Sequence, residues 1–409
     1  MSAALPDLLW IQPFTRPVRG SVALPGSKSI TNRALILAAL SPNTVILRGA
    51  LFSRDTCIMV AALRALGFAV ETDEAALTIT IVGRGGEIPV REATIDVGNA
   101  GTAARFLTAF VCLRPDGVYR FDGDEAMRRR PIGALLEALA SQGAAASAPS
   151  FPFTLTTAGL RGGTVALDAS ESSQMLSALL MVAPHARTSL AVNLKGGTVS
   201  RPFVTMTERM IERFAAAPAA YAIEGDATAA SYFLALPLVT GGHVDLPAFS
   251  TSNSLQGDVR FAKVLKNVGP AVTRRGVTAD FNAFSDTFLT LAAIAPLLDG
   301  PTHITGIAHT RKQETDRVAG MARELTRLGQ HVIETEDSLE IHPRPIKSGV
   351  EIETYHDHRF AMSFGILGCH NLHGDDRPWL AIRDPACCGK TFPNFFELLA
   401  SLREKSLEP

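Results

Sequence analysis

Ten residues near the start of the chain have the composition of an anion-binding turn. Residues 24–33 read LPGSKSITNR, so a glycine, a lysine, two serines and an arginine directly precede the apolar run 34–40. A helix that begins here points its backbone N–H groups and the positive end of its dipole at the turn. Lys28 and Arg33 add two full positive charges. The segment therefore predicts a site for a phosphorylated or carboxylated small molecule.

The bulk composition indicates that such a site must be local. The chain has 409 residues, of which 46% are hydrophobic, and its formal net charge is −1 at pH 7. This length suggests two or three domains with large cores. Because the net charge is close to zero, the chain has no general attraction to nucleic acid or to anionic lipid.

The sequence shows no export or membrane signal. Its N-terminus lacks a basic region followed by an apolar stretch, and no apolar segment reaches the roughly 18 residues of a membrane helix. The five cysteines are spaced neither as a disulfide framework nor as a zinc site. Four of them lie in apolar or mixed surroundings and are expected to be buried thiols. We expect a reduced, cytoplasmic location.

A small-polar turn followed by an apolar helical run recurs along the chain. The six copies begin at Gly26, Gly98, Ser170, Gly225, Ser285 and Asp357. Their spacing of about 55–75 residues is that of a βαβ-type unit rather than a solenoid repeat. The strand-like stretches between them include 78–82, 163–167 and 189–193, and further helices fit 56–66, 131–140 and 315–328. This pattern predicts an α/β protein with two domains of three units each.

Each copy could also be an ordinary helix cap. Small polar residues before apolar helices are common N-caps, and this explains every copy singly. It explains less well why several copies also carry a lysine, an arginine, a glutamine or an aspartate. We therefore favour a shared anion site at the helix N-termini.

Eight motifs, in order along the chain, resemble those of the EPSP synthase (3-phosphoshikimate 1-carboxyvinyltransferase) family of enolpyruvyl transferases. The motifs occupy residues 24–33, 99–105, 130–132, 172–174, 256–258, 314–317, 357–359 and 390–393. Gly-Ser-Lys-Ser alone would be a weak signal, but the ordered set is highly specific and covers nearly the whole chain.

The resemblance implies a two-domain enolpyruvyl transferase fold of class α/β. Each domain would contain three repeated βαβαββ units, with helix N-termini facing the cleft between the domains. Residues 1–26 and 225–409 would form a discontinuous domain containing both termini, and residues 27–224 an inserted domain. The implied motion is closure of the cleft around the substrates.

The resemblance also implies a reaction. The family moves the enolpyruvyl (1-carboxyvinyl) group of phosphoenolpyruvate to the 5-hydroxyl of shikimate 3-phosphate and releases phosphate, in the shikimate pathway to chorismate and aromatic amino acids. Addition followed by elimination, through a tetrahedral intermediate, needs cations for phosphates and carboxylates and groups that exchange protons. The implied partners are these two substrates, with no nucleic acid, no membrane, no metal and no cofactor, and the chain would be a monomer.

Three overlapping sets of site residues follow from the resemblance. The catalytic set is Lys28, Asp286 and Glu314. The phosphoenolpyruvate set is Lys28, Gly101, Arg130, Gln174, Arg317, Arg359 and Lys390. The shikimate 3-phosphate set is Lys28, Ser29, Arg33, Ser172, Ser173, Gln174, Ser200, Asp286 and Gln313. Five further candidates are Asn99, Thr102, Phe203, His309 and His358.

The implied proton chemistry rests on two carboxylates. Asp286 would accept the 5-hydroxyl proton, and Glu314 would handle the proton at the methylene carbon, with Lys28 as an alternative donor. The plainer interpretations are that Asp286 caps a helix and that Arg317 only forms an i,i+3 pair with Glu314. His358 is expected to orient phosphate, since the i,i+2 spacing of the two nearby histidines does not suit a metal.

Three residues depart from the commonest family pattern. Gln313 stands where many members have lysine, His309 where asparagine is common, and Phe203 where tyrosine is common. All three lie on the acceptor side of the site that the resemblance implies, so a related phosphorylated cyclitol or sugar is an alternative acceptor. Gly101, which leaves room for the inhibitor glyphosate in the family, is retained, whereas Phe106 replaces a common proline.

Three other functions compete with this interpretation. UDP-N-acetylglucosamine enolpyruvyl transferase shares the fold but lacks the Gly-Ser-Lys-Ser start and commonly has a reactive loop cysteine, whereas Cys112 lies in an apolar run. An enzyme resembling RNA 3′-phosphate cyclase would need nucleotide and RNA surfaces, which the net charge of −1 disfavours. A non-catalytic anion-binding protein would need neither Asp286 nor Glu314.

Overall fold

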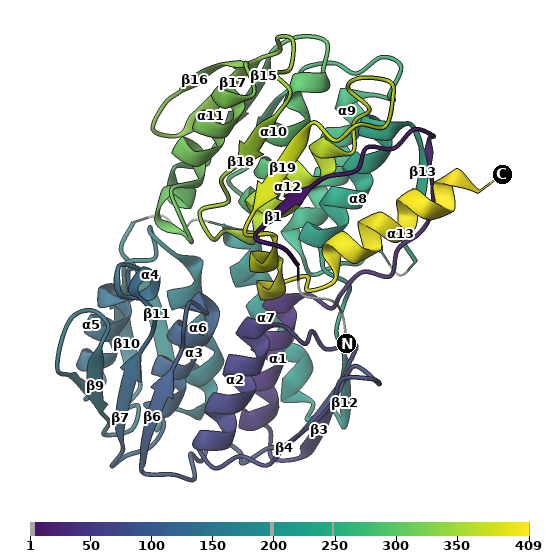
Figure 1. Cartoon of the computed structure of the whole chain (residues 1–409). Helices are drawn as coiled ribbons and strands as arrows, with labels where there is room; N and C mark the ends of the chain where they lie inside the picture. Colours follow the sequence, from purple (N-terminus) through teal and green to yellow (C-terminus); the bar gives the residue numbers. More distant parts are fainter. Residues whose placement is uncertain (1–4, 197–199, 248, 409) are drawn as a thin grey trace. The chain divides into compact units, whose positions relative to one another are not determined.

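The chain divides into two compact α/β units, which are described separately (Figure 1). The computed structural model describes residues 5–196, 200–247 and 249–408. Unit 1 comprises residues 1–25 and 225–409 and contains both termini, and unit 2 comprises residues 26–224. The chain therefore passes between the units twice, at Pro25–Gly26 and at Glu224–Gly225.

Unit 2 is built from three successive β/α modules. Its helices are α1 (Lys28–Leu40), α2 (Arg54–Ala65), α3 (Gly101–Val111), α4 (Glu125–Arg128), α5 (Gly133–Ser141), α6 (Ser173–Val182) and α7 (Arg201–Ala215). Its strands are β3 (Thr44–Arg48), β4 (Val70–Asp73), β5 (Thr78–Val82), β6 (Glu92–Asp96), β7 (Val118–Asp122), β8 (Ala145–Ala146), β9 (Phe153–Thr156), β10 (Gly163–Leu167), β11 (Leu190–Leu194) and β12 (Ala220–Ala222).

The sheets of unit 2 repeat one pattern. Two four-stranded sheets have the orders β12-β3-β5-β4 and β6-β7-β9-β8, and in each the first two strands are parallel and the others antiparallel. In the third module, β10 and β11 form only a parallel pair. The last strand of this module, β12, joins the sheet of the first module instead, so the end of the unit pairs with its beginning.

Unit 1 repeats this organisation. Its helices are α8 (Ala227–Thr240), α9 (Phe261–Val268), α10 (Phe288–Ile294), α11 (Arg317–Arg327), α12 (His358–Gly368) and α13 (Phe395–Leu407). Its strands are β1 (Leu8–Trp10), β2 (Val18–Ser21), β13 (Gly242–Asp245), β14 (Thr278–Asp280), β15 (Thr302–Thr305), β16 (His331–Glu334), β17 (Ser338–His342), β18 (Val350–Ile352) and β19 (Leu380–Arg383). The order β14-β15-β17-β16 has the parallel and antiparallel pattern of unit 2, beside the smaller sheets β1-β19-β18 and β13-β2.

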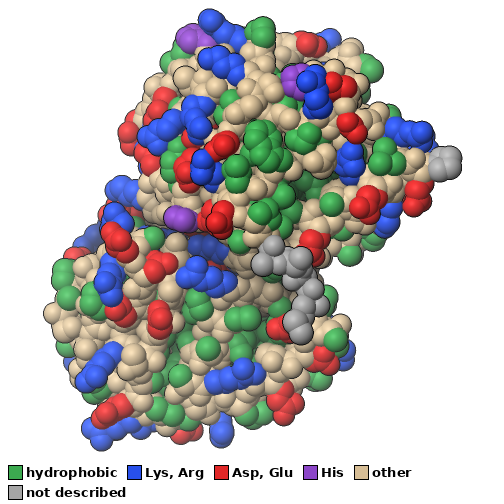
Figure 2. Space-filling model, in the orientation of Figure 1, with side chains coloured by type: hydrophobic (Ala, Val, Ile, Leu, Met, Phe, Trp, Pro, Cys, Tyr) green, Lys and Arg blue, Asp and Glu red, His purple; other side chains and the backbone are tan. Residues whose placement is uncertain are grey.

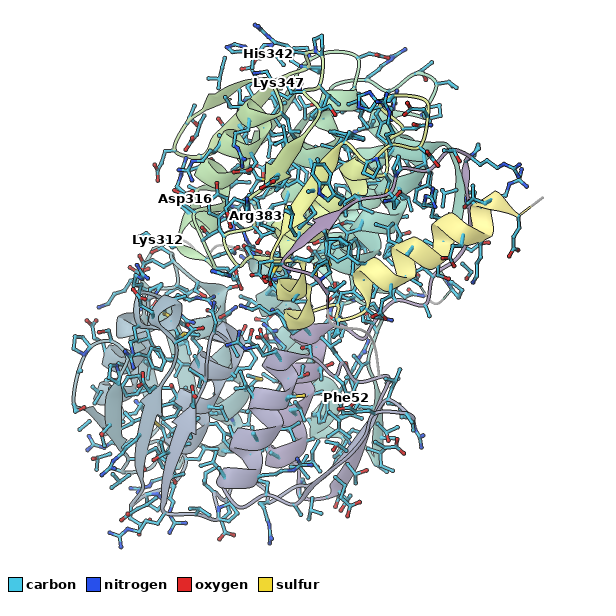
Figure 3. The ribbon with its side chains drawn as sticks, viewed as in Figure 1. Phe52, Lys312, Asp316, His342, Lys347 and Arg383 are labelled. Atoms are coloured by element: carbon cyan, nitrogen blue, oxygen red, sulfur yellow. The ribbon has the colours of Figure 1, made fainter. Side chains whose placement is uncertain are left out.

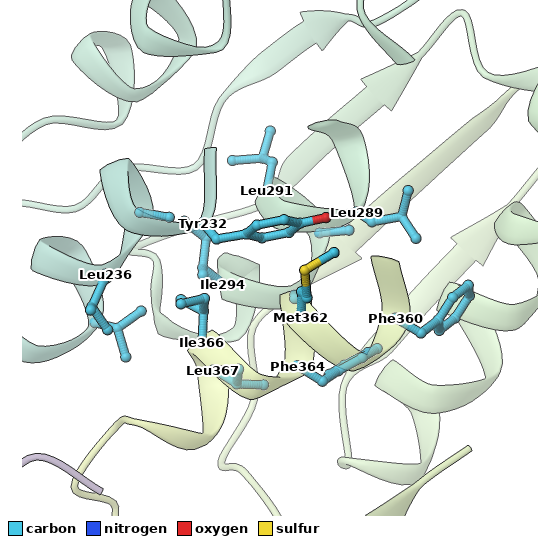
Figure 4. Packing of buried hydrophobic residues seen from close by; sticks show 14 of the residues in the cluster. Tyr232, Leu236, Leu289, Leu291, Ile294, Phe360, Met362, Phe364, Ile366 and Leu367 are labelled. Carbon is cyan, nitrogen blue, oxygen red and sulfur yellow. The ribbon is translucent and has the colours of Figure 1, made fainter. Parts of the chain in front are cut away.

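Each of the six small-polar turns opens a helix of a unit's core. The helices that follow them are α1, α3 and α6 in unit 2 and α8, α10 and α12 in unit 1. All residues of α3, α10 and α12 are buried, which is expected of helices that are apolar on every side. Figure 4 shows the unit 1 core, where Tyr232 of α8 lies among apolar side chains of α10 and α12. The predicted six-fold β/α repetition is confirmed.

Several local predictions need correction. The helices expected at 56–66, 131–140 and 315–328 are α2, α5 and α11, each displaced by one or two residues at an end. The capping box of Ser53 and Thr56 starts α2 earlier than predicted, and the Asp316 cap starts α11 later. The strand expected at 189–193 begins one residue later.

The expectation of four buried cysteines is wrong. Cys57 is exposed and Cys387 is half-buried, whereas Cys112, Cys369 and Cys388 are buried. Within the described ranges, every helix is too short or too polar to span a lipid bilayer. Basic and acidic side chains intermingle over the face shown in Figure 2, in keeping with the net charge of −1.

Candidate active site

The candidate residues of unit 1 follow the carboxyl ends of strands. Asp286 follows β14, Glu314 and Arg317 follow β15, and Lys390 follows β19. Figure 3 shows Lys312, Asp316 and Arg383 at this end of unit 1, and His342 and Lys347 at the opposite end. Side chains far apart in sequence therefore meet at one end of the unit, where ligands commonly bind in α/β folds.

Arg317 is the centre of this group, and only 1% of its surface is exposed. Its Nε donates to Asp357 Oδ2 at 2.7 Å, its Nη1 to Asp286 Oδ1 at 2.9 Å, and its Nη2 to Glu314 Oε2 at 2.9 Å. Nη1 also donates to Gln313 Oε1. Burial alone would lower the pKa of Arg317, but the three carboxylates raise it above its ordinary value. The guanidinium therefore stays charged although it is dehydrated.

Two further cations extend the group into a row of alternating charges. Arg359 Nη2 donates to Asp286 Oδ2 at 2.6 Å, and Lys390 Nζ lies 3.1 Å from Glu314 Oε1. The order of contact is Lys390, Glu314, Arg317, Asp286 and Arg359, and we call these five residues the alternating cluster. Each of its two carboxylates joins two cations, so substrate anions would meet a preorganised set of charges.

Helix starts hold the cluster in place. Asp316 accepts the backbone N–H of Ala319 and so caps α11, whose first residue is Arg317. Asp357 caps α12 by accepting the N–H of Arg359, while it also pairs with Arg317. Asp286 lies in the 3-10 turn Ser285–Thr287, and the N-cap positions of this turn and of α10 are held by Phe284 and Thr287. Asp286 therefore does not occupy the N-cap position of either element, and the Arg317–Glu314 pair is one of several that Arg317 forms.

His309 and His358 occupy different environments beside the cluster. His309 Nε2 lies 2.9 Å from Ser285 Oγ. Burial lowers the pKa of His309, and the carboxylates of Asp286 and Asp337 partly oppose this shift. His358 is fully buried, with its Nδ1 3.6 Å from Asp357 Oδ1. No group of three or more His, Cys, Asp or Glu residues within 5–196, 200–247 and 249–408 could hold a metal ion.

A further carboxyl group of unit 1, that of Asp258, was not among the predicted site residues. Asp258 is buried and accepts a hydrogen bond from Thr228 Oγ1 at 3.1 Å. Burial and the nearby charge of Asp286 raise its pKa to about 7, against the opposing effect of Arg359. The Gln-Gly-Asp motif marked the segment, but gave no sign that this carboxyl group lies within the field of the cluster.

In unit 2, Lys28 is the first residue of α1, and its Nζ lies 3.1 Å from Asp55 Oδ2. Asp55 is buried in the first turn of α2. The pair fixes the ammonium group at the turn that was predicted to bind an anion. Sequence reasoning missed Asp55, whose only local signal is its place inside the capping box of Ser53 and Thr56.

Arg130 lies over the start of α3, where Gly101 leaves it room. Its Nη1 lies 3.3 Å from Asn99 Oδ1, and a Cβ at Gly101 would be 2.5 Å from its Nη2. Arg105, which is fully buried, donates to the carbonyl oxygens of Gly101 at 3.2 Å and of Pro131. Arg105 thus positions both segments that form this part of the site, a role that the sequence did not reveal.

Arg33 faces the interior of unit 2, and only 2% of its surface is exposed. It donates to Thr207 Oγ1 at 2.7 Å and to Ser177 Oγ at 3.1 Å, and its guanidinium lies 5.9 Å from the ring centre of Phe203. Burial lowers the pKa of Arg33 to about 9. This geometry ties α1 to α6 and α7, and the contacts of Arg33 and Phe203 with the acceptor stay a prediction.

The remaining candidates of unit 2 lie at helix starts. Ser29 opens α1, Thr102 opens α3, Ser172 and Ser173 open α6, and Ser200 precedes α7. Ser172 Oγ accepts the N–H of Gln174 at 3.3 Å, so the cap interpretation holds for this residue. Gln174 Oε1 is buried and has no hydrogen-bond partner among the residues described.

The chain matches the family model described as EPSP synthase (3-phosphoshikimate 1-carboxyvinyltransferase) over residues 14–217 and 215–399. It is 56% identical to a protein of that enzyme name from Opitutus terrae, across 98% of this chain and 99% of the relative. A relative of the same name from Nostoc punctiforme is 38% identical, across 98% of this chain and 100% of the relative.

Solved structures share the fold. An EPSP synthase from Acinetobacter baumannii has a TM-score of 0.77 at 23% identity and covers 97% of this chain and 98% of its own. The enolpyruvyl transferase NikO from Streptomyces tendae has a TM-score of 0.71 at 18% identity, with 97% coverage of both chains. The predicted two-domain α/β fold is therefore confirmed.

Proposed function

The chain belongs to the EPSP synthase (3-phosphoshikimate 1-carboxyvinyltransferase) family, and we propose that it transfers the enolpyruvyl group of phosphoenolpyruvate to the 5-hydroxyl of shikimate 3-phosphate. The single observation that carries this proposal beyond family membership is the alternating cluster. It combines three cations, which suit phosphate and carboxylate groups, with two carboxylates, of which Glu314 is placed to exchange a proton.

Phosphoenolpyruvate would be held by the cations of the set that the resemblance implies. Arg317 and Arg359 offer planar guanidinium groups that suit bidentate pairing with a carboxylate or phosphate. Lys390, Lys28 and Arg130 add positive charge. These side chains are already oriented by Glu314, Asp55 and Asn99, so little ordering remains to be done when the substrate binds.

The proposed reaction has two stages. In the addition stage, the methylene carbon gains a proton, the 5-hydroxyl oxygen bonds to the neighbouring carbon, and the hydroxyl proton leaves. In elimination, the bond from that carbon to the phosphate oxygen breaks, and the methyl group gives back one proton. Glu314 would carry the proton at the methylene carbon, because it is the carboxylate joined to Lys390, a member of the phosphoenolpyruvate set.

A different acceptor is the second candidate function. It is favoured by two residues that depart from the family pattern, since Gln313 contacts Arg317 and His309 contacts Ser285. These polar groups would alter which hydroxyl the site recognises, and leave the donor cations unchanged. The acceptor would then be a related phosphorylated cyclitol or sugar.

Phosphate release tests both candidates. The enzyme should release phosphate only when phosphoenolpyruvate and shikimate 3-phosphate are both present. Turnover with another phosphorylated acceptor but not with shikimate 3-phosphate would reject the acceptor and retain the donor. No turnover with any acceptor would reject the proposed function.

Glu314→Gln examines the catalytic assignment. It should lower kcat by about 100-fold or more, with a smaller change in substrate affinity. Glu340→Gln, in the middle of β17, where Glu340 pairs with His342, is the matched control and should behave as wild type. Equal losses of binding and turnover would make Glu314 a positioning residue.

A further inference from the structure

His309 and Ser285 form a hydrogen-bonded pair next to Asp286. His309 lies in the 3-10 turn Ala308–Lys312 after β15, and Ser285 opens the 3-10 turn Ser285–Thr287 after β14. The distance from His309 Nε2 to Ser285 Oγ is 2.9 Å. Ser285 is buried and His309 is half-buried, so the contact is largely shielded from water.

Asp286 itself is badly placed to accept a proton. Its Oδ1 accepts a hydrogen bond from Arg317 at 2.9 Å, and its Oδ2 accepts one from Arg359 at 2.6 Å. Both arginines are buried. A proton on either oxygen would replace a charge-assisted hydrogen bond to a dehydrated cation, which is costly. The proton of the acceptor hydroxyl therefore needs another destination close by.

We propose that His309 receives this proton through Ser285, an inference that rests on the proposed enolpyruvyl transfer. In this relay, Ser285 O–H donates to the unprotonated Nε2 of His309. As the acceptor oxygen bonds to the carbon of phosphoenolpyruvate, its proton passes to Ser285 Oγ, and the serine proton passes to Nε2. With the proton that Glu314 gives to the methylene carbon, the products are the tetrahedral adduct, an unchanged serine, an imidazolium and an ionised Glu314. Ser285 is then the catalytic contact, and His309 acts through it.

The charges around His309 suit this role. Asp286 faces it from the turn after β14, Asp337 from the turn between β16 and β17, and Arg317 from α11. Burial lowers the pKa of His309, so the imidazole is neutral and able to accept a proton at neutral pH. The two carboxylates then stabilise the imidazolium once it forms. Asp337 also accepts the N–H of Ala308 at 2.7 Å, which fixes the turn that carries His309.

The pH profile of kcat/KM for shikimate 3-phosphate tests the relay. Wild type should lose activity as the pH falls through the pKa of His309, below the ordinary value of about 6.5. His309→Asn should be about 100-fold slower at neutral pH and should lack this acidic limb. Ser285→Ala should show the same two changes, since it interrupts the relay. His331→Asn, an exposed histidine of the same unit, should keep the wild-type profile.

Two outcomes overturn the inference. One is an unchanged acidic limb in His309→Asn with a rate within about threefold of wild type. The other is a normal rate and profile in Ser285→Ala, which decides the question if His309→Asn does not fold. Shikimate 3-phosphate binding, measured by calorimetry, should be kept within about threefold in both variants. Failure of wild type to turn over the substrate pair would instead reject the proposed function.

Discussion

Arg317→Met should destabilise unit 1 severely, because it removes the cation but leaves its acceptors in place. Asp357 and Glu314 have almost no exposed side-chain surface, and Asp286 is largely buried. Breaking a buried ion pair by removing one partner costs about 3–5 kcal/mol. Asp286 and Glu314 keep Arg359 and Lys390 as partners, so the loss should come chiefly from Asp357 and stay within this range.

The chain contains its own reporter for this measurement. Both of its tryptophans, Trp10 and Trp379, belong to unit 1. Trp379 is fully buried, and its Nε1 donates to the carbonyl oxygen of His370 at 2.7 Å. Urea unfolding followed by tryptophan fluorescence therefore reports unit 1 without a signal from unit 2. A loss of 3–5 kcal/mol would lower the folding equilibrium constant by roughly two to four powers of ten.

The pH dependence of the loss identifies its cause. The cost arises from ionised carboxylates without a cation, so protonating them in acid should narrow the difference between variant and wild type. Arg317→Lys should restore only part of the stability, since an ammonium group cannot reach three carboxylates as a planar guanidinium does. Arg377→Met, which removes an exposed ion pair with Asp375, should leave the midpoint of urea unfolding unchanged. A loss below about 1 kcal/mol, or one independent of pH, would refute this reasoning.

Two further substitutions probe the site. Gly101→Ala places a methyl group 2.5 Å from Arg130 Nη2, so it should raise the KM for phosphoenolpyruvate about tenfold with a smaller effect on kcat. Gly133→Ala is the control, because a methyl group there meets only ordinary contacts. If Gly101→Ala and Gly133→Ala had equal KM values for phosphoenolpyruvate, the side chain of Arg130 would be able to move aside. Asp258→Asn should raise the melting temperature at about pH 8.5 and not at about pH 3.5. The pKa of Asp258 is raised to about 7 in the folded protein, compared with about 3.9 in the unfolded chain. Its protonated form therefore contributes stability that is fully present below about pH 3.9 and is lost as the pH rises through about 7. A variant without added stability in alkali would contradict this assignment, and tryptophan fluorescence can follow both melts.

The fold was largely predictable because its signals are local. A small polar cap and an apolar run over the next ten residues identify each core helix, whatever lies elsewhere in the chain. Local signals do not indicate which strands pair with each other. β12 pairs with β3 across roughly 170 residues, rather than with the nearer β10 or β11. Several strands of similar composition compete for each position, and tertiary packing decides between them.

The sequence indicated which residues form the site, but not which cation pairs with which carboxylate. The motifs named Lys28, Arg130 and Arg317, yet nothing local indicates which carboxylate each would meet. Asp55 resembles any acidic residue in a first helical turn, and its pairing with Lys28 depends on how α1 and α2 pack. Arg33 shows the same limit, because its motif does not indicate that its side chain donates to Thr207 and Ser177 within unit 2.

The pairing has a consequence for catalysis that composition alone could not show. In the alternating cluster, every cation is already matched by a carboxylate, so a bound anion must share Arg317 and Lys390 with Glu314. As phosphoenolpyruvate takes up part of this positive charge, Glu314 loses compensation and its affinity for a proton rises. Asp286 stays hydrogen-bonded to both Arg317 and Arg359, so its affinity for a proton changes less. We therefore expect Glu314 to become able to carry a proton only when the donor is bound, which would limit wasteful proton exchange in the empty enzyme. Exchange of the methylene hydrogens of phosphoenolpyruvate with solvent should accordingly need the carboxyl group of Glu314, and Glu314→Gln should abolish it even at saturating substrate.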